Sequence, residues 1–410
     1  MALKQILASK QRTVITILLT AFSTFILIFG QGFMLGTWDS ILKKTIELYP
    51  GYMKVINREF EENPSFENII FDVKKTKEDI AKVSGVVSST ARFENYALYA
   101  TDDQTIAGLL VGIEPQNESR ISKLKASLVQ GEYLSDEDTN SLYIGIGLAK
   151  RLQLGVGDEL AIISNGADFS FVADKVIIKG VFKTELFSFN NSAAFMNKKY
   201  FDTIMASENM ATSIVMLPPN MDSVAKLSLD VSKYINKDEK VENYYTSMKD
   251  LFDMMKTKQV FGVFQLAIMF SVIFFVIAIY SFLNIYARIR EFGVLKAIGT
   301  SPWQVAKMLL AEAVILSSLG VAMGGAGGAY LVDYFEKHPL VAKDVYGDRV
   351  DIEKATEEFN MVQITVMPTL FRGDLILIDI LLIFGISLLS VFYPVIMINR
   401  KRPIDAMRHV

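Results

Sequence analysis

The most regular feature of the chain is the alternation of four long apolar runs with ordinary charged sequence. The runs cover residues 13–38, 260–287, 305–332 and 375–398. The first two contain no charged residue, the third contains only Lys307 and Glu312, and the fourth contains only Asp379. A helix needs roughly 20 mostly apolar residues to cross the hydrocarbon core of a bilayer. The pattern therefore predicts four transmembrane helices.

The first run is too long for a cleaved signal peptide, whose apolar region has about 7–15 residues. No small-residue cleavage site of the A-x-A type follows it. We therefore interpret residues 13–38 as a retained membrane anchor.

Lysine and arginine gather at one set of run ends, which by the positive-inside rule is the cytoplasmic set. These residues are Lys4, Lys10, Arg12, Arg288, Arg290, Lys296, Lys307, Arg400, Lys401, Arg402 and Arg408. The distribution predicts that the N-terminus (1–12), a short connection (288–304) and the C-terminus (399–410) are cytoplasmic. It places residues 39–259 and a loop, 333–374, on the opposite side of the membrane.

The outer region 39–259 has the mixed pattern of an α+β domain. Strand-like runs are Tyr52–Ile56, Leu109–Ile113, Leu142–Ile146, Glu159–Ile163, Lys175–Phe182 and Ser213–Leu217. Helical patterns between them are Lys74–Lys82, Leu148–Leu154 and Ser223–Ile235. The fold class predicted for the whole chain is therefore a membrane α-helical protein with four transmembrane helices and a large extracytoplasmic α+β domain. The strand order, and whether the region is one domain or two, stay open.

The outer region is expected to join the membrane through stalk helices. The pattern after Trp38 is amphipathic, and a helix without a break from Thr246 to Arg290 would be roughly 65 Å long at 1.5 Å per residue. Such a stalk would tie the outer domain rigidly to the membrane helices.

The connection 288–304 predicts a helix, a tight turn and a second helix. Gly299 is placed to end the first helix, because glycine adopts the left-handed conformation at low cost. Ser301 is a good N-cap, Pro302 suits the first helical position, and Gln304 can complete a capping box. This element is either a plain surface hairpin or a coupling element that docks on a partner.

Composition excludes several classes of site. The chain has no cysteine, so it has no disulfide and no thiolate metal site. Its histidines, His338 and His409, are far apart in sequence, and we predict no metal site. The net charge of -3 argues against nucleic-acid binding. No local set of nucleophile, base and orienting group indicates an enzyme.

Three sets of residues in the apolar runs are candidates for more than lipid contact. Gly320, Gly324 and Gly328 repeat every four residues, which suits close helix packing within the chain or between subunits. Glu312 and Asp379 are near the ends of their runs, where we expect interfacial positions rather than a proton relay. Aromatic residues that face lipid, or that line a substrate cavity, are Phe25, Phe29, Phe33, Phe261 and Phe264.

The run EFGVLKAIGTSPWQVAKMLLAEAVILSSLG (291–320) resembles the FtsX-like permease family, which includes the LolC and LolE lipoprotein-release permeases and MacB. The C-terminal run YPVIMINRKRPIDAMR (393–408) resembles the end of the same family. In the outer region, residues 142–163 and 176–185 resemble the MacB-type periplasmic core domain, and residues 51–70 resemble its start in LolE-like members.

The resemblance implies a permease in the bacterial inner membrane that works as a dimer, with itself or with a paralogue, beside an ABC ATPase dimer. Contact with the ATPase carries over to Glu291, Phe292, Gly293, Leu295, Lys296, Gly299, Ser301 and Pro302. The chain contains no Walker A pattern, so we expect a separate ATPase to bind ATP and Mg²⁺ and no cofactor in this chain. A periplasmic carrier or adaptor is a further expected partner.

Three functions within the family remain open from the residues. Lipoprotein release or related lipid trafficking is favoured by the LolE-like start of the outer region and by the extra loop 333–374. MacB-like mechanotransmission suits the long stalk helices. FtsX-like signalling to periplasmic partners ranks last, because the outer domain of that relative is much smaller.

Overall fold

The chain divides into two units in the computed structural model, which describes residues 10–341, 344, 347 and 366–400. The helical unit contains residues 10–40, 255–341 and 366–400 of this part, and the α+β unit contains residues 41–254. The predicted cytoplasmic N-terminus up to residue 9, most of the outer loop and the basic C-terminal motif at 403–408 lie outside the described residues.

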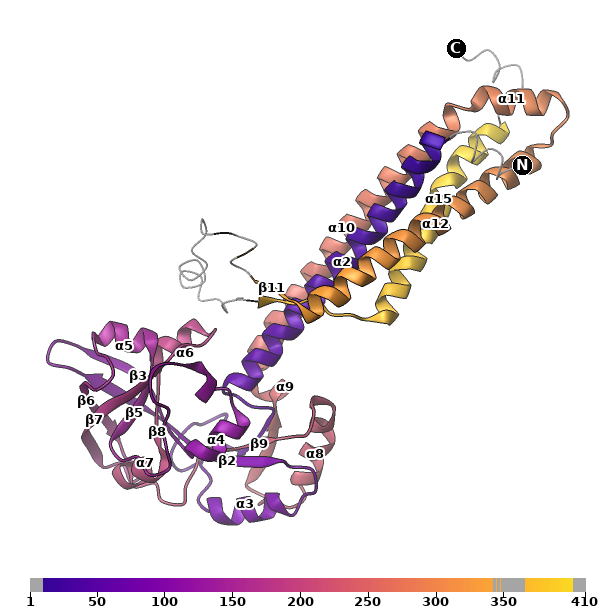
Figure 1. Ribbon diagram of the computed structural model, residues 1–410. Helices are drawn as coiled ribbons and strands as arrows, with labels where there is room; N and C mark the ends of the chain where they lie inside the picture. Colours follow the sequence, from indigo (N-terminus) through magenta and orange to yellow (C-terminus); the bar gives the residue numbers. More distant parts are fainter. Residues whose placement is uncertain (1–9, 342–343, 345–346, 348–365, 401–410) are drawn as a thin grey trace. The chain divides into compact units, whose positions relative to one another are not determined.

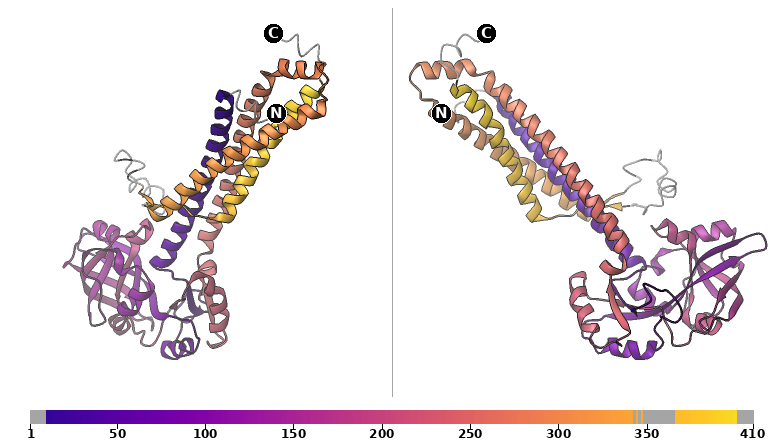
Figure 2. Two further views of the ribbon diagram at one scale, coloured as in Figure 1. Left: turned by 45° about the vertical axis from the view of Figure 1, so that its right-hand side comes forward. Right: turned by 180° about the vertical axis from the view of Figure 1, so that it is seen from behind.

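Four long apolar helices build the helical unit, and they run side by side in Figures 1 and 2. They are α2 (Lys10–Leu48), α10 (Lys249–Tyr286), α12 (Pro302–Lys337) and α15 (Gly373–Arg400). In the described part of the chain these are the helices long and apolar enough to cross a membrane. A cluster of Leu27, Ile273, Val321 and Ile383 takes one side chain from each helix into a shared interior. A two-stranded hairpin, β11 (Leu340–Val341) with β12 (Val366–Met367), lies between α12 and α15 in sequence.

The helix considered from Thr246 to Arg290 is not continuous, because it is interrupted near both ends. Asn243 and Thr246 form a capping box that starts a separate short helix, α9 (Tyr244–Ser247), and Met248 leaves the helical conformation with φ -119° and ψ 38°. At the other end α10 stops at Tyr286, before a turn. The 38 residues of α10 give a length of about 57 Å at 1.5 Å per residue.

A ten-stranded sheet forms the frame of the α+β unit, with the order β10-β1-β9-β2-β3-β8-β5-β7-β4 and β6 paired to β2 and β7. The strands are β1 (Met53–Asn57), β2 (Ser88–Ala100), β3 (Thr105–Ile113), β4 (Leu128–Gly131), β5 (Ser141–Gly145), β6 (Glu159–Asn165), β7 (Phe171–Phe182), β8 (Ala193–Asn197), β9 (Ser213–Leu217) and β10 (Glu239–Asn243). Because β6 joins β7 back to β2, six strands close into a ring. The predicted α+β class is confirmed.

Short helices connect the strands of the α+β unit. They are α3 (Val73–Ala81), α4 (Pro115–Ile121), α5 (Ile146–Leu152), α6 (Phe187–Ser192), α7 (Lys198–Met205), α8 (Val224–Val231) and the 3₁₀ turns η1 (Lys125–Ser127) and η2 (Met221–Ser223). One apolar cluster, with Phe93 and Ile144, belongs to the ring, and a second, with Val55, Ile80 and Leu227, joins β1 and β9 to α3 and α8. A third cluster, with Tyr143, Phe182 and Phe195, packs between β3, β5, β7 and β8. The long strand β2 contributes Phe93 to the first cluster and Ala91 to the second.

A buried ion pair lies where α2 ends in the α+β unit. The Arg92 guanidinium on β2 donates to both carboxylate oxygens of Glu118 on α4, at 2.9 and 2.6 Å. It also donates to the carbonyl oxygen of Tyr49 and lies 4.1 Å from the centre of that ring. Tyr49 follows the last residue of α2, so these contacts anchor the end of that helix to β2 and α4.

Acid should weaken the α+β unit through Glu114, the residue before α4. Burial acts to raise the pKa of this carboxyl, but the Lys77 ammonium at 2.5 and 2.6 Å and the Asn117 amide hold the pKa below its usual 4.5. A lowered folded-state pKa stabilises the fold above the unfolded value and loses that contribution as the pH falls. The melting temperature should therefore drop as the pH falls below about 4.5. A Glu114→Gln variant, melted from pH 7 to pH 3.5, should have a lower melting temperature at pH 7 and a smaller drop than the native chain.

Candidate functional site

The connection between α10 and α12 folds as the helix, turn and helix that its sequence predicts. The first helix is α11 (Ile289–Ala297). Gly299 follows it with φ +99°, and the amide of Thr300 donates to the Leu295 carbonyl at 3.0 Å while that of Gly299 donates to the Lys296 carbonyl at 3.1 Å. This is the Schellman arrangement, in which a left-handed residue closes the last helical turn. A β-carbon added to Gly299 would meet nothing within 4 Å. The positive φ, and not a close neighbour, is therefore the reason for glycine at this position.

The start of α12 has the predicted capping. The Ser301 hydroxyl accepts from the Gln304 amide at 3.3 Å, and the Gln304 side chain accepts from the Ser301 amide at 3.0 Å. Pro302 occupies the first helical position. The turn between α11 and α12 is therefore defined at both ends by local sequence.

Arg288 attaches α11 to the rest of the helical unit. Its guanidinium donates to both oxygens of Glu312 on α12, at 3.1 and 3.0 Å, and to Glu291 at 3.1 Å. Burial acts to lower the pKa of Arg288, but the two carboxylates raise it above its usual value, so the group stays charged. Glu312 is buried, and its charge is neutralised by Arg288, a residue 24 positions earlier in the chain.

The inner side of α11 is packed and its outer side is open. Phe292 is fully buried in a cluster with Val305 and Leu309 of α12 and Val391 of α15. Val294 on α11, Ile298 just after it and Trp303 in the first turn of α12 are 47%, 74% and 64% exposed, and we call these three residues the outer face. The Lys307 ammonium lies 5.6 Å from the centre of the Trp303 ring. The arrangement presents apolar side chains on a rigid base.

The predicted coupling residues divide between these two sides. Phe292 and Gly293 are buried and position α11, whereas Glu291, Gly299, Ser301 and Pro302 are exposed. Leu295 and Lys296 are half-buried, and burial lowers the pKa of the Lys296 ammonium. Sequence reasoning missed Ile298 and Trp303 as exposed apolar residues, although their places beside the predicted turn could have indicated them. The Arg288–Glu312 pair had no sequence signal.

The glycine repeat of α12 lies against α2. A β-carbon on Gly324 would overlap the carbonyl oxygen of Ala21, and one on Gly320 would lie 2.7 Å from the β-carbon of Thr20. One on Gly328 would lie 3.1 Å from the β-carbon of Ile28. These glycines therefore let two helices of the same chain approach closely.

The five phenylalanines proposed for a substrate cavity fall into two groups. Phe25, Phe29 and Phe33 stack along α2 with ring centres 6.2 Å apart, and Phe29 meets Phe335 of α12 at 5.9 Å. Phe261 and Phe264 are 69% and 67% exposed on α10. Phe29 therefore packs between α2 and α12, whereas Phe261 and Phe264 are open to whatever surrounds α10.

Asp379 is buried inside the helical unit. With its amide nitrogen turned toward the carboxylate, Gln31 on α2 donates to both oxygens of Asp379 on α15. Asp379 therefore makes a polar contact between two helices, and its position relative to the membrane interface stays a prediction. Among the described residues, no group of three or more His, Asp or Glu side chains is placed to hold a metal ion.

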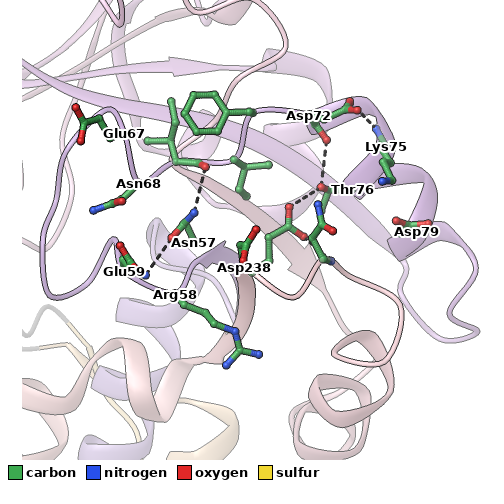
Figure 3. Close-up of a pocket in the computed structure, with 15 residues that line it drawn as sticks. Asn57, Arg58, Glu59, Glu67, Asn68, Asp72, Lys75, Thr76, Asp79 and Asp238 are labelled. Carbon is green, nitrogen blue, oxygen red and sulfur yellow. Dashed lines mark hydrogen bonds between the residues drawn. The ribbon is translucent and has the colours of Figure 1, made fainter.

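Figure 3 shows a cavity of about 390 Å³ in the α+β unit, between the end of β1, α3 and the start of β10. Carboxylates dominate its lining, with Glu59, Glu67 and Asp238 among them. The Thr76 hydroxyl donates to Glu239 at 2.8 Å. That hydrogen bond joins α3 to β10, so this part of the cavity wall holds two elements of the fold together.

Two family models match the chain, one in its first part and one in its last part. The FtsX-like permease C-terminal model matches residues 263–403, and the MacB-like periplasmic core domain model matches residues 13–233, which is more than half of the 410 residues. The chain belongs to the FtsX-like and MacB-type family of ABC transporter permeases. In a permease of this family, α11 and the turn after it are the connection between the second and third apolar helices.

Two curated relatives of this permease are the lipoprotein-releasing system transmembrane proteins LolC of Xylella fastidiosa, strains Temecula1 and 9a5c. They are 21% and 20% identical over an alignment of length 314, and the match covers 73% of this chain and 73% of each relative. Among solved structures, the periplasmic region of MacB from Actinobacillus actinomycetemcomitans is 15% identical and covers 53% of this chain and 97% of its own, with a TM-score of 0.37. The extracellular domain of the transporter YknZ from Gram-positive bacteria is also 15% identical and covers 47% and 99%, with a TM-score of 0.34.

Proposed function

We propose that this permease transmits ATP hydrolysis by a separate ABC ATPase dimer to its α+β unit, and that it serves lipoprotein release or lipid trafficking from the bacterial inner membrane. The observation that carries the ATPase contact is the outer face of α11 and the turn. Exposed apolar side chains on a base held by a buried ion pair suit a permanent protein contact. The lipoprotein role is supported by the two LolC relatives.

The proposed topology has four membrane-spanning helices with both termini in the cytoplasm. The helix α11 contains Arg290 and Lys296 and directly follows Arg288, which agrees with a cytoplasmic position by the positive-inside rule. The α+β unit would then lie outside the cytoplasm, where a carrier or adaptor protein is a partner. A second permease copy or a paralogue completes the proposed complex.

The ATPase contact can be tested with Ile298→Asp and Trp303→Asp. Each variant places a charge in the outer face, so we expect the amount of ATPase that purifies with the permease to fall by about tenfold or more. Co-expression with an ATPase encoded nearby, followed by measurement of bound ATPase and of hydrolysis, provides both readouts. Leu229→Asp is the matched control, because Leu229 is as exposed but lies on α8 of the α+β unit. If no ATPase associates with the native chain, the transporter proposal fails.

A second candidate function is MacB-like mechanotransmission, favoured by the match of residues 13–233 to the MacB-like periplasmic core domain. FtsX-like signalling to periplasmic partners is a further alternative within the family. Proteoliposomes that contain the complex and an acylated lipoprotein separate these roles. ATP-dependent release of the lipoprotein to a soluble acceptor supports the first proposal. Hydrolysis without release, at the same level of bound ATPase, favours the mechanical or signalling role.

A further inference from the structure

Two buried polar atoms of α10 and α15 have no hydrogen-bond partner among the described residues. They are Oδ1 of Asn284 on α10 and the hydroxyl oxygen of Ser387 on α15. Beside them, the hydroxyls of Ser281 on α10 and Ser390 on α15 form a hydrogen bond at 3.1 Å. A buried polar atom without a partner costs free energy, so an arrangement that pairs both atoms would be favoured.

These four side chains have the same spacing on both helices. Asn284 follows Ser281 by three residues, and Ser390 follows Ser387 by three residues. The two helices run in the same direction (Figure 1). If α10 moved three residues toward the start of α15, Ser281 would lie level with Ser387, and Asn284 would lie level with Ser390. Both unpaired atoms would then gain a partner, for a displacement of about 4.5 Å at 1.5 Å per residue.

The apolar residues beside these positions fit both registers. Counted from the contact between Ser281 and Ser390, Ile285 on α10 lies close to the level of Val395 on α15. After the displacement, Ile285 would lie level with Val391. Both valines already belong to the same buried cluster as Ile285. Because residues four apart lie on one face of a helix, the displacement would exchange one apolar neighbour for another.

The helix α10 is also the least buried of the four apolar helices. In its most apolar stretch 11% of the residues are buried, against 33%, 44% and 28% in α2, α12 and α15. The backbone leaves the helical conformation before α10 at Met248 and after it at Arg288, with φ values of -119° and -106°. The Arg288 guanidinium is held by Glu312 of α12. The turn before Arg288 is therefore a joint at which α10 can move while α11 stays in place.

We propose that α10 slides along α15 by about three residues between two registers. One is the observed register, and in the other Ser281 pairs with Ser387 and Asn284 pairs with Ser390. Movements of about one helical turn between packed elements occur in proteins that switch between two states. In the proposed transporter, ATP hydrolysis would drive this slide. The inference itself stands on contacts between helices of this chain, and its test needs neither ATP nor the ATPase.

Pairs of introduced cysteines can distinguish the two registers, because the native chain contains no cysteine. The pair Ser281→Cys with Ser390→Cys should form a disulfide in the observed register, and Ser281→Cys with Ser387→Cys should form one in the shifted register. A disulfide holds its β-carbons about 3.5–4.5 Å apart, so a displacement of about 4.5 Å separates the two pairs. The matched control is Ala278→Cys with Ser390→Cys, which would need an equal slide in the opposite direction.

The full chain is oxidised in lipid nanodiscs without nucleotide, and the cross-linked fraction is followed over time by mass spectrometry of its peptides. The shifted pair should cross-link at least about tenfold faster than the control pair, because neither register brings the control cysteines together. Asn284→Leu, added to the shifted pair, should slow its cross-linking about threefold or more, because it removes the interhelical hydrogen bond to Ser390.

Two outcomes would overturn the proposal. If the shifted pair cross-links no faster than the control while the observed pair cross-links fully, α10 does not slide and the fold simply tolerates the unpaired atoms. If the observed pair does not cross-link, the register from which the slide is counted is wrong, and the proposal fails with it. Since no ATPase is present, both outcomes leave the ATPase contact untouched.

Discussion

Replacing Glu118 with alanine should lower the free energy of unfolding of the α+β unit by roughly 3–5 kcal/mol. The substitution leaves the buried Arg92 guanidinium with no carboxylate to accept its hydrogen bonds, and breaking a buried ion pair by removing one partner is strongly destabilising. The carbonyl oxygen of Tyr49 would remain as a weaker, neutral partner. The loss should also loosen the end of α2, because Tyr49 is held through the same guanidinium.

The measurement is thermal or denaturant unfolding of the full chain in detergent, read by near-ultraviolet circular dichroism. Glu61→Ala is the matched control, since its pair with Lys240 is more exposed and should contribute at most about 1 kcal/mol. The double variant Arg92→Met with Glu118→Leu removes both charges and should recover much of the lost stability. A Glu118→Ala variant no less stable than the Glu61→Ala control would contradict the assignment.

Replacing Gly324 with alanine should destabilise the helical unit by roughly 1–3 kcal/mol, the usual cost of forcing atoms into a packed interface. The new β-carbon would overlap the carbonyl oxygen of Ala21, which is backbone and can move only if α2 and α12 separate. Leucine at the same position should prevent the two helices from packing.

Gly30→Ala is the control for the glycine prediction. Gly30 is also inside a long helix, α2, but its added β-carbon would meet nothing within 4 Å. Alanine favours the helix over glycine by roughly 0.5–1 kcal/mol, so this variant should be as stable as the native chain or more stable. The melting temperatures of the two variants in the same detergent should therefore shift in opposite directions. Equal shifts would mean that the contact between α2 and α12 does not depend on Gly324.

The sequence predicted β1, β3, β5, β6, β7 and β9 in whole or in part. β9 was predicted with its observed bounds, and β5 and β6 to within one or two residues at their ends. β2, the longest strand, was missed. Its first part pairs with β9 and its last part with β6, so its side chains pass from one core to the other and show no steady alternation. β8 and β10 were missed as well; both are short, and β10 is rich in charge.

The candidate site was predictable where it depends on neighbours in the chain. The end of α11 at Gly299 and the start of α12 at Ser301 are local capping events, so residue types at adjacent positions were enough. The pairs Arg288–Glu312 and Gln31–Asp379 join residues that are distant in sequence, and no periodicity indicates them. The break before α10 was missed because the apolar pattern of a long helix says little about where a short cap interrupts it.

Local order along the chain was enough to predict the four apolar helices, the α+β texture of the outer region and the turn at Gly299. These features depend on hydrophobic runs, alternation and capping, which act over a few residues. Three features depend on contacts between distant segments: closure of the six-stranded ring, packing of the α12 glycines on α2, and the Arg288–Glu312 pair. Contacts between distant segments are decided by close packing and by the pairing of buried polar groups over the whole chain, so they are seen only in the folded structure.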